Sequence, residues 1–229
     1  MIGGIINTME TSALVEHFNQ ADISFDVWAE QRRGKVTASL VHKLMKGFNN
    51  ETAKTYIKTL AGESIGIYDE DNYQSPAMIA GSVNEFAAMQ EYISYPTTGA
   101  VIYGSKVFVP LGENAGVSPD GVELIDFQKI YLEVKCPFTP NKYVELILCN
   151  TVEKLKKERA DVYWQCVMNM LVLDCQAAKV LVYHPKKGLR TIDVPRIEED
   201  ILECQEAINK AVELKLELTA KLIDVLTTN

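Results

Sequence analysis

The chain has 229 residues, 47% of them hydrophobic, which is enough for one domain with a substantial core. Its formal net charge of −8 argues against a protein that coats nucleic acid by bulk electrostatics, although an enzyme needs only a locally basic groove. The five cysteines are odd in number and form no Cys-x-x-Cys pair, which predicts reduced core thiols and no four-cysteine metal site.

Targeting and charge patterns place further limits on the protein. No apolar run reaches membrane-spanning length, and the opening residues MIGGIINTMETS have no basic segment ahead of a long apolar one. We therefore expect no signal peptide, no membrane partner and a cytoplasmic location. Residues 32–46 hold five Lys or Arg and no acid, whereas residues 196–224 hold eight acids and four bases. A basic surface is thus expected near residues 32–46.

Helical patterns dominate the first part of the chain and strand patterns follow. Helices are predicted over residues 10–20, 25–34, 37–45, 51–61 and from Pro76 to about Tyr92, with a polar loop at 62–75. Strands are predicted over residues 101–109, 115–118, 122–126, 130–136, 178–184 and 189–194. Further helices are predicted over residues 140–149 and 158–173 and along the C-terminal segment, whose apolar face includes Ile201, Cys204, Ile208, Val212 and Leu218.

This order of elements predicts an α/β (α+β) domain in which helices flank a mixed central sheet. We divide the chain into an N-terminal extension (1–24), a core (25–195) and a C-terminal amphipathic helix packed on that core (196–229).

The strand at 130–136 carries the first candidate chemistry. Its apolar residues alternate with polar ones, so Glu133 and Lys135 project from the same face. Asp120 lies in a Pro-Asp-Gly turn that opens the preceding strand. Two carboxylates on adjacent strands can converge on a hard divalent cation such as Mg²⁺ or Mn²⁺, and the carbonyl of Val134 could add a ligand.

A lysine beside such an ion can orient a water against a phosphodiester or hold the negative charge that develops there. The pattern P-D-x(12)-E-x-K is that of the PD-(D/E)xK nucleases, whose restriction-endonuclease-like core would account for the expected mixed sheet. The simpler alternative is a solvated strand face with an ion pair.

Two polar residues in apolar helices point to the same place. Glu85 shares one helix face with Gly81, Ala88 and Tyr92, and a carboxylate in such a stripe needs a cation or a metal ion. Gln165 is embedded in the apolar run at 159–173, where a metal-bound water, an active-site lysine or backbone groups could satisfy its amide.

The basic segment suggests an anion site. Arg32 follows Trp28 by four residues, and Ser39 opens the next predicted helix. A helix start with a hydroxyl and a nearby arginine is a phosphate site on simple electrostatic grounds. The alternative is a helix-capping serine beside a surface arginine.

Taken together, these pieces resemble one family, the lambda-exonuclease type, also called YqaJ-like viral recombinases. The matching runs are W-x(3)-R-x-G-K-V-T-A-S (28–39), G-x(3)-E-x(2)-A (81–88), S-P-D-G (118–121), L-E-V-K-C-P-F (132–138) and Y-x-Q (163–165). They occur in that order over about residues 25–185.

The resemblance implies a metal-dependent exonuclease that degrades one strand of linear duplex DNA from a 5′-phosphorylated end and leaves 3′ tails for phage-type recombination. It implies two Mg²⁺ ions, with Mn²⁺ as a substitute, held by Asp120, Glu133, the carbonyl of Val134 and Glu85. Lys135 and Gln165 would position the attacking water. The residues implied for the 5′ phosphate and the DNA are Arg32, Ser39, Lys35 and Thr37.

The implied partners are duplex DNA ends, a single-strand annealing protein and further copies of the chain, with a ring-shaped trimer as one such assembly. Three alternatives remain from the residues alone. One is another PD-(D/E)xK nuclease, either RecB-like or a restriction endonuclease. Another is a non-catalytic DNA-end clamp. The last is an α/β domain with an ion pair on its surface.

Overall fold

The computed structural model describes residues 24–68, 76–104 and 106–228. Its helices are α2 (Phe25–Arg32), α3 (Ala38–Val41), α4 (Glu51–Ser64), α5 (Pro76–Ile93), α6 (Pro140–Leu148), α7 (Val152–Glu158), α8 (Ala160–Leu173) and α9 (Glu198–Thr227). Its strands are β1 (Val36–Thr37), β2 (Ala100–Tyr103), β3 (Val109–Leu111), β4 (Ala115–Val117), β5 (Gly121–Ile125), β6 (Gln128–Lys135), β7 (Ala177–His184) and β8 (Gly188–Pro195).

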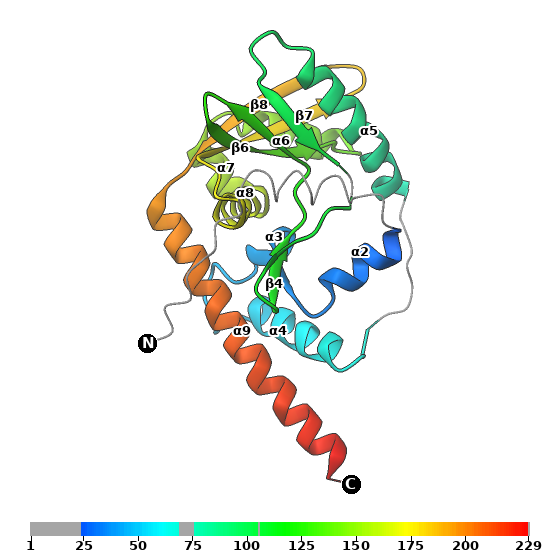
Figure 1. Cartoon of the computed structure of the whole chain (residues 1–229), viewed down its shortest axis with the longest axis vertical. Coiled ribbons are helices and arrows are strands. Elements are labelled where there is room, and N and C mark those ends of the chain that lie inside the picture. The colour runs from blue at the N-terminus through cyan, green and yellow to red at the C-terminus, as the bar shows by residue number, and fades with distance from the viewer. Residues whose placement is uncertain (1–23, 69–75, 105, 229) are drawn as a thin grey trace.

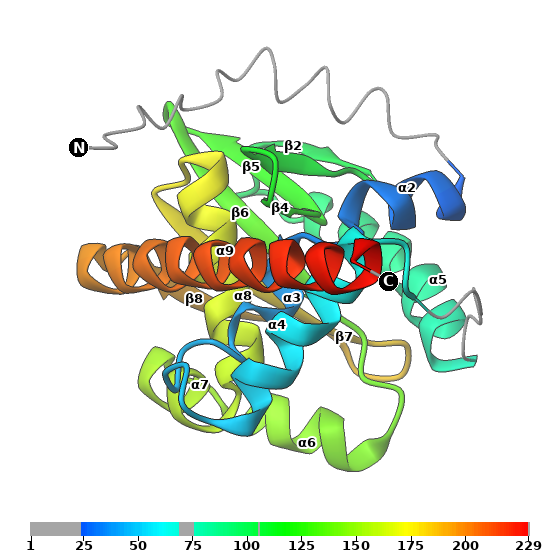
Figure 2. The same cartoon turned by 90° about the horizontal axis from the view of Figure 1, so that it is seen from below.

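A five-stranded mixed sheet forms the centre of the fold, in the order β2-β5-β6-β7-β8 (Figures 1 and 2). Its neighbouring strands are antiparallel except for β6 and β7, which run parallel. A parallel pair needs a long crossover, and here α6, α7 and α8 supply it. The expected α/β class with a mixed sheet flanked by helices is confirmed.

Strand β6 is covered on both faces. Its residues Leu132 and Val134 pack in one apolar cluster with Ala88 and Tyr92 of α5. Tyr131, on the opposite face, belongs to the main core, which includes most of α8. The alternation of residue types along β6 therefore separates two buried environments and does not separate core from water.

A smaller three-stranded sheet, β1-β4-β3, lies between the main sheet and the long helix α9 (Figures 1 and 2). Strand β1 pairs parallel to β4, with Val36 opposite Ala115, so residues far apart in sequence are joined here. The chain enters α3 directly after β1. This small sheet thus places the basic segment next to the turn that leads into β5.

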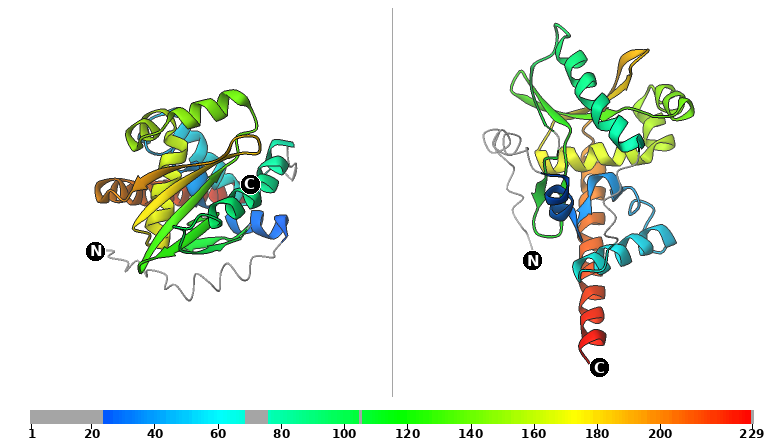
Figure 3. Two further views of the ribbon diagram at one scale, coloured as in Figure 1. Left: turned by 90° about the horizontal axis from the view of Figure 1, so that it is seen from above. Right: turned by 90° about the vertical axis from the view of Figure 1, so that its right-hand side faces the viewer.

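Helix α9 packs on the domain from its start to Lys215, which is buried and donates a hydrogen bond to Asn114 Oδ1 at 2.7 Å. Ile201, Cys204 and Ile208 are buried, as the amphipathic pattern predicted, whereas Val212 and Leu218 are half-buried. Its last turns project away from the domain (Figure 3). Neither α9 nor any other described helix is long and apolar enough to cross a bilayer.

Several predicted boundaries were wrong for local reasons. The strand predicted over 101–109 divides into β2 and β3, which belong to different sheets, and Lys106 between them has a positive φ of 63°. The helix predicted over 37–45 ends at Val41, because the following amides bond three residues back, as in Leu44 N–H to Val41 C=O, and form tight turns.

Two elements were missed. Strand β1 has only two residues, too few for a periodic pattern. Helix α7 precedes α8 and is separated from it by Arg159, whose φ of −130° is not helical. Its start is marked by Thr151, whose side chain caps the Lys154 amide. The helix predicted over 10–20 lies outside the described residues.

Asp200 fastens α9 to the crossover helices, which gives a test of the fold. Its carboxylate accepts hydrogen bonds from Lys156 at 2.6 and 2.8 Å and from the hydroxyl of Tyr163. Asp200→Ala leaves a buried hydroxyl and a lysine without their acceptor. We expect a loss of roughly 2 kcal/mol in the free energy of unfolding, measured by urea denaturation. Glu203→Ala, at an exposed position of the same helix, should change it little, and equal losses would contradict this role for Asp200.

Candidate active site

The centre of the candidate site is the carboxylate of Glu133, which is only 1% exposed. One oxygen accepts a hydrogen bond from Lys135 Nζ at 2.5 Å and the other accepts one from the hydroxyl of Tyr131. Burial lowers the pKa of Lys135, but the charges of Glu133 and Asp120 outweigh that effect and raise it. The ammonium group therefore stays charged. A solvated ion pair, the simpler alternative from sequence, is wrong, because this carboxylate is buried.

Asp120 lies at the start of β5, next to the end of β6. Its Oδ2 accepts a hydrogen bond from the backbone N–H of Val134 at 2.7 Å, beyond the last β5–β6 pair. Burial raises the pKa of Asp120, and the charges of Glu133 and Glu85 raise it further. The proton is thus favoured on Asp120 because carboxylates gather in a place with little water.

Glu85 reaches the site from α5, which packs on the opposite face of the main sheet from α8. Burial raises its pKa, as does the charge of Glu133, while Lys135 lowers it. Ala88 and Tyr92, on the same helix face, are buried against the sheet. The two explanations offered by the sequence, pairing with a lysine and metal binding, both required Glu85 to approach this group of residues, and it does.

Gln165 is brought to the same lysine by α8. Its Oε1 accepts a hydrogen bond from Lys135 Nζ at 3.2 Å. The predicted neighbours of a buried glutamine included an active-site lysine, and this is the partner observed. Lys135 is thereby held between Glu133 and Gln165, with both acceptors fixed by regular secondary structure.

The residues around Lys135 fit a divalent cation in their chemistry. Burial raises the pKa values of Asp120 and Glu85, and the excess negative charge of three carboxylates around one ammonium group raises them further. As the side chains lie, no three His, Cys, Asp or Glu residues of the described chain are arranged to hold a metal ion. Mg²⁺ does not require three, because it typically binds through one or two carboxylates and keeps several waters.

A second cluster centres on Arg32, at the end of α2. Its guanidinium donates hydrogen bonds to Ser118 Oγ at 2.9 Å and Ser39 Oγ at 3.2 Å, and it stacks 4.2 Å from the centre of the Trp28 ring. Burial lowers the pKa of Arg32. No carboxylate in the described residues forms an ion pair with Arg32. Arg32 is thus a partly desolvated cation whose hydrogen-bond partners, among the residues that the structure describes, are neutral hydroxyls.

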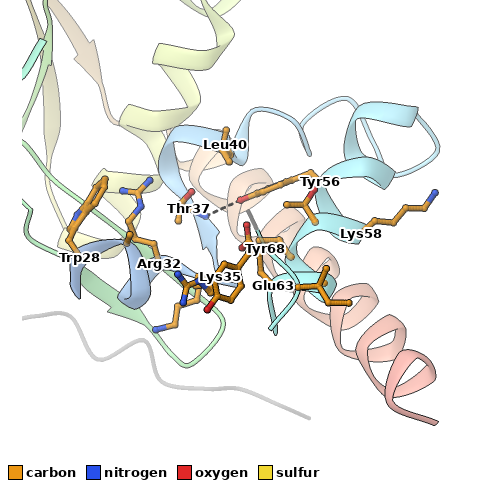
Figure 4. Close-up of a pocket in the computed structure, with 15 residues that line it drawn as sticks. Trp28, Arg32, Lys35, Thr37, Leu40, Tyr56, Lys58, Glu63 and Tyr68 are labelled. Carbon is orange, nitrogen blue, oxygen red and sulfur yellow. Dashed lines mark hydrogen bonds between the residues drawn. The ribbon is translucent and has the colours of Figure 1, made fainter. Parts of the chain in front are cut away.

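Arg32 also borders a cavity of about 670 Å³ (Figure 4). Thr37 and Lys35 line it, together with Tyr56, whose hydroxyl accepts a hydrogen bond from the Thr37 amide at 3.2 Å. The hydroxyl of Thr37 lies 3.5 Å from that of Ser39. The ammonium group of Lys35 lies over the Phe108 ring, 5.1 Å from its centre.

The proposed role of Ser39 needs a correction. Ser39 does not begin a long helix: Thr37 is the N-cap of α3, which has only four residues. So short a helix contributes little dipole, and the attraction for an anion comes from Arg32 and the hydroxyl groups.

The sequence analysis did not include Ser118 in this cluster, and it noted Trp28 beside Arg32 without giving it a role. The Trp28 indole N–H also donates to Ser118 Oγ, at 3.1 Å. The spacing of four residues between Trp28 and Arg32 was a usable signal, because it places both side chains on one helix face. The contact of Ser118 with α2 spans 86 residues and could not be found from spacing.

The crowded carboxylates give a prediction that can be tested without measuring activity. The pKa of Asp120 is raised in the folded protein, so its contribution to stability is greatest at acid pH and is lost as pH rises through that value. Asp120→Asn retains an acceptor for the Val134 amide. In EDTA at neutral or alkaline pH, we expect the melting temperature of Asp120→Asn to equal that of the wild type or to exceed it by up to a few degrees.

Mg²⁺ should raise the melting temperature of the wild type but not of Asp120→Asn, since binding requires the ionised carboxylate. Glu113→Gln, at an exposed turn position, should respond to Mg²⁺ like the wild type. An undiminished Mg²⁺ effect in Asp120→Asn would show that Asp120 is not part of a metal site.

Comparison with known proteins identifies the fold and the family of this chain. LHK-Exo, an alkaline exonuclease from Laribacter hongkongensis solved with dAMP, superposes with a TM-score of 0.72 and 22% identity over 89% of this chain and 100% of its own. A phage-related exonuclease from Haemophilus somnus 129PT gives a TM-score of 0.61 and 15% identity over 82% and 96%. These likenesses establish the fold. No curated protein matches the sequence significantly. Residues 27–176 match the YqaJ-like viral recombinase domain, and the chain therefore belongs to that family.

Proposed function

We propose that this protein is a metal-dependent exonuclease that degrades one strand of linear duplex DNA from a 5′-phosphorylated end and leaves 3′ single-stranded tails. The observation that carries the proposal is Arg32. It is a half-buried, partly desolvated cation with hydroxyl partners and no described carboxylate partner, and it is joined through Ser118 to the segment that presents Asp120. A desolvated charge without a counterion is costly, so an anionic ligand would stabilise this arrangement.

A terminal phosphate suits this cluster better than an internal one. Arg32 can offer its planar guanidinium to phosphate oxygens, and the Ser39 and Ser118 hydroxyls can donate to the others. The indole ring of Trp28 stacks on the guanidinium and fixes its orientation. Binding at a fixed distance from Asp120 would select which phosphodiester reaches the carboxylates, so polarity and step size follow from geometry.

The catalytic roles follow from the charges around Glu133. When bound, two Mg²⁺ ions, or Mn²⁺ in their place, supply an activated water and stabilise the leaving oxygen. Asp120, Glu133, the carbonyl of Val134 and Glu85 are the groups of this chain that would hold them. Lys135 stays protonated beside Glu133 and can orient a water or stabilise charge on the phosphate, and Gln165 fixes its direction.

The proposed partners follow from this role. They are duplex DNA ends and a single-strand annealing protein that receives the 3′ tails, in the cytoplasm of a bacterial cell. A ring-shaped assembly of copies, such as a trimer, would keep the enzyme on one strand through many cycles.

The alternatives differ from this proposal in specific ways. A restriction endonuclease would cut closed circular duplex DNA, which an exonuclease spares. A non-catalytic end clamp would bind ends but leave them intact with Mg²⁺ present. It would gain nothing from buried carboxylates, since they repel phosphate. Incubation of end-labelled linear DNA and closed circles, each with Mg²⁺ or EDTA, separates the three functions.

The first functional prediction concerns Lys135. Lys135→Ala should reduce cleavage of linear duplex by roughly 100-fold or more, because a charge aimed at the reacting phosphate is lost. DNA binding, measured by anisotropy in Ca²⁺, should persist. Glu133 loses its partner, so some stability should be lost in EDTA and recovered with Mg²⁺. Lys210→Ala, which removes an exposed lysine on α9, should cleave normally. Normal cleavage by Lys135→Ala would eliminate the assigned mechanism.

The second concerns polarity. Duplex with 5′ phosphates should be degraded at least tenfold faster than the same duplex with 5′ hydroxyls, since a charge-assisted contact is worth about 1.5–3 kcal/mol. Arg32→Ala should remove most of that difference, mainly by slowing the phosphorylated substrate. Arg33 borders the same cavity but contacts neither serine in the described structure, so Arg33→Ala is the matched control and should retain the preference. Equal rates on both substrates would refute recognition of the 5′ phosphate.

A further inference from the structure

A second cavity, of about 270 Å³, lies between α4 and the second half of α9, apart from the candidate active site. Its residues fall into an apolar group and a charged group. The apolar group consists of Phe48, Ile57, Leu214 and Leu218. The charged group consists of Lys54, Lys58, Lys221 and Glu217. We call this cavity the α4–α9 groove.

The groove is built by regular helix spacing. Lys54 and Lys58 are one turn apart on α4, and Leu214 and Leu218 are one turn apart on α9, so each pair shares a helix face. Helices α4 and α9 lie side by side at this point, and α9 continues beyond it (Figure 2). The groove is therefore a fixed feature of two packed helices.

Its charge is opposite in sign to that of the protein. Three lysines and one glutamate line it, whereas the chain as a whole carries −8. Lys54 pairs with Glu51 at 3.0 Å, but both side chains are well exposed, so the pair is weak and can exchange partners. Within the described residues, neither Lys58 nor Lys221 forms an ion pair. The lysines are thus available to an incoming acidic group.

We propose that the α4–α9 groove binds a short acidic peptide segment of another protein, with an apolar side chain against the leucines and carboxylates facing the lysines. The cavity is smaller than the ~300–1,000 Å³ typical of small-molecule sites, which suits single side chains better than a whole cofactor. Duplex DNA could contact the lysines, but it has no apolar side chain to pack against the apolar group of the groove. The pairing of an apolar anchor with a charged rim is the usual anatomy of a peptide interface.

The probe is a labelled peptide of alternating aspartate and glycine that ends in Leu-Phe, titrated with the full chain and followed by fluorescence anisotropy. We expect saturable binding that is lost when lysine replaces the aspartates or serine replaces Leu-Phe. The double variant Lys54→Glu, Lys221→Glu should weaken binding about tenfold or more, because two attractive contacts become repulsive. Lys58 is left unchanged because it also borders the cavity beside Arg32.

The matched control is Lys210→Glu, which reverses an exposed charge on α9 outside the groove and should bind the peptide like the wild type. Both variants should cleave linear duplex normally, so this test is independent of the proposed nuclease function. Three outcomes would overturn the proposal. In the first, the double variant and the wild type bind the peptide with equal affinity. In the second, labelled oligothymidine binds the wild type and loses affinity for the double variant as the peptide does. In the third, the wild type self-associates and the double variant does not. The last two would assign the groove to single-stranded nucleic acid or to a second copy.

Discussion

The buried carboxylate of Glu133 is the constraint around which the candidate site is organised. Almost no water reaches it, so Lys135 and Tyr131 must balance and satisfy its charge from within the same strand. Glu133 projects from the same face of β6 as Tyr131, which packs in the main core, so that face must be covered. Helix α5 covers one face and α8 the other, and each contributes one polar residue to the site, Glu85 and Gln165. The two helices that cover β6 are thus the ones that complete the site.

The segment that holds Ser118 and Asp120 connects the site to the Arg32 cluster. Ser118 accepts hydrogen bonds from both Arg32 and Trp28, and Asp120 follows it by two residues. The small sheet holds this connection in place, because β1 pairs with β4 and so brings the basic segment beside the start of β5. A shift of one element would therefore move the anion site and the carboxylates together. In a nuclease that measures from a terminal phosphate, this coupling would protect the distance between recognition and cleavage.

The acidity of the chain is reconciled with an anionic substrate by segregation of charge. Acidic residues collect along α9, while the cations near α2 and β1 surround a cavity whose lining includes a single acid, Glu63. The carboxylate of Glu63 accepts a hydrogen bond from the Gly34 amide at 2.7 Å. Lysines of α4 also face the other side, toward the α4–α9 groove. Helix α4 thus separates two positively charged surfaces. Long-range repulsion by the rest of the molecule would be screened within about 10 Å at ordinary salt, which leaves local charge to decide binding.

The sequence by itself determined the class of fold, the β5–β6 turn, and the polar residues Asp120, Glu133, Lys135, Glu85, Gln165, Arg32 and Ser39, because alternation, helix spacing and polar residues in apolar runs are local signals. It did not determine that the polar face of β6 is buried, since alternation looks the same whether that face meets water or another helix. The division of the sheet in two, the short α3 and the contact of Ser118 with Arg32 were decided by tertiary structure. Each depends on partners distant in the chain, and no local pattern encodes which segments will meet.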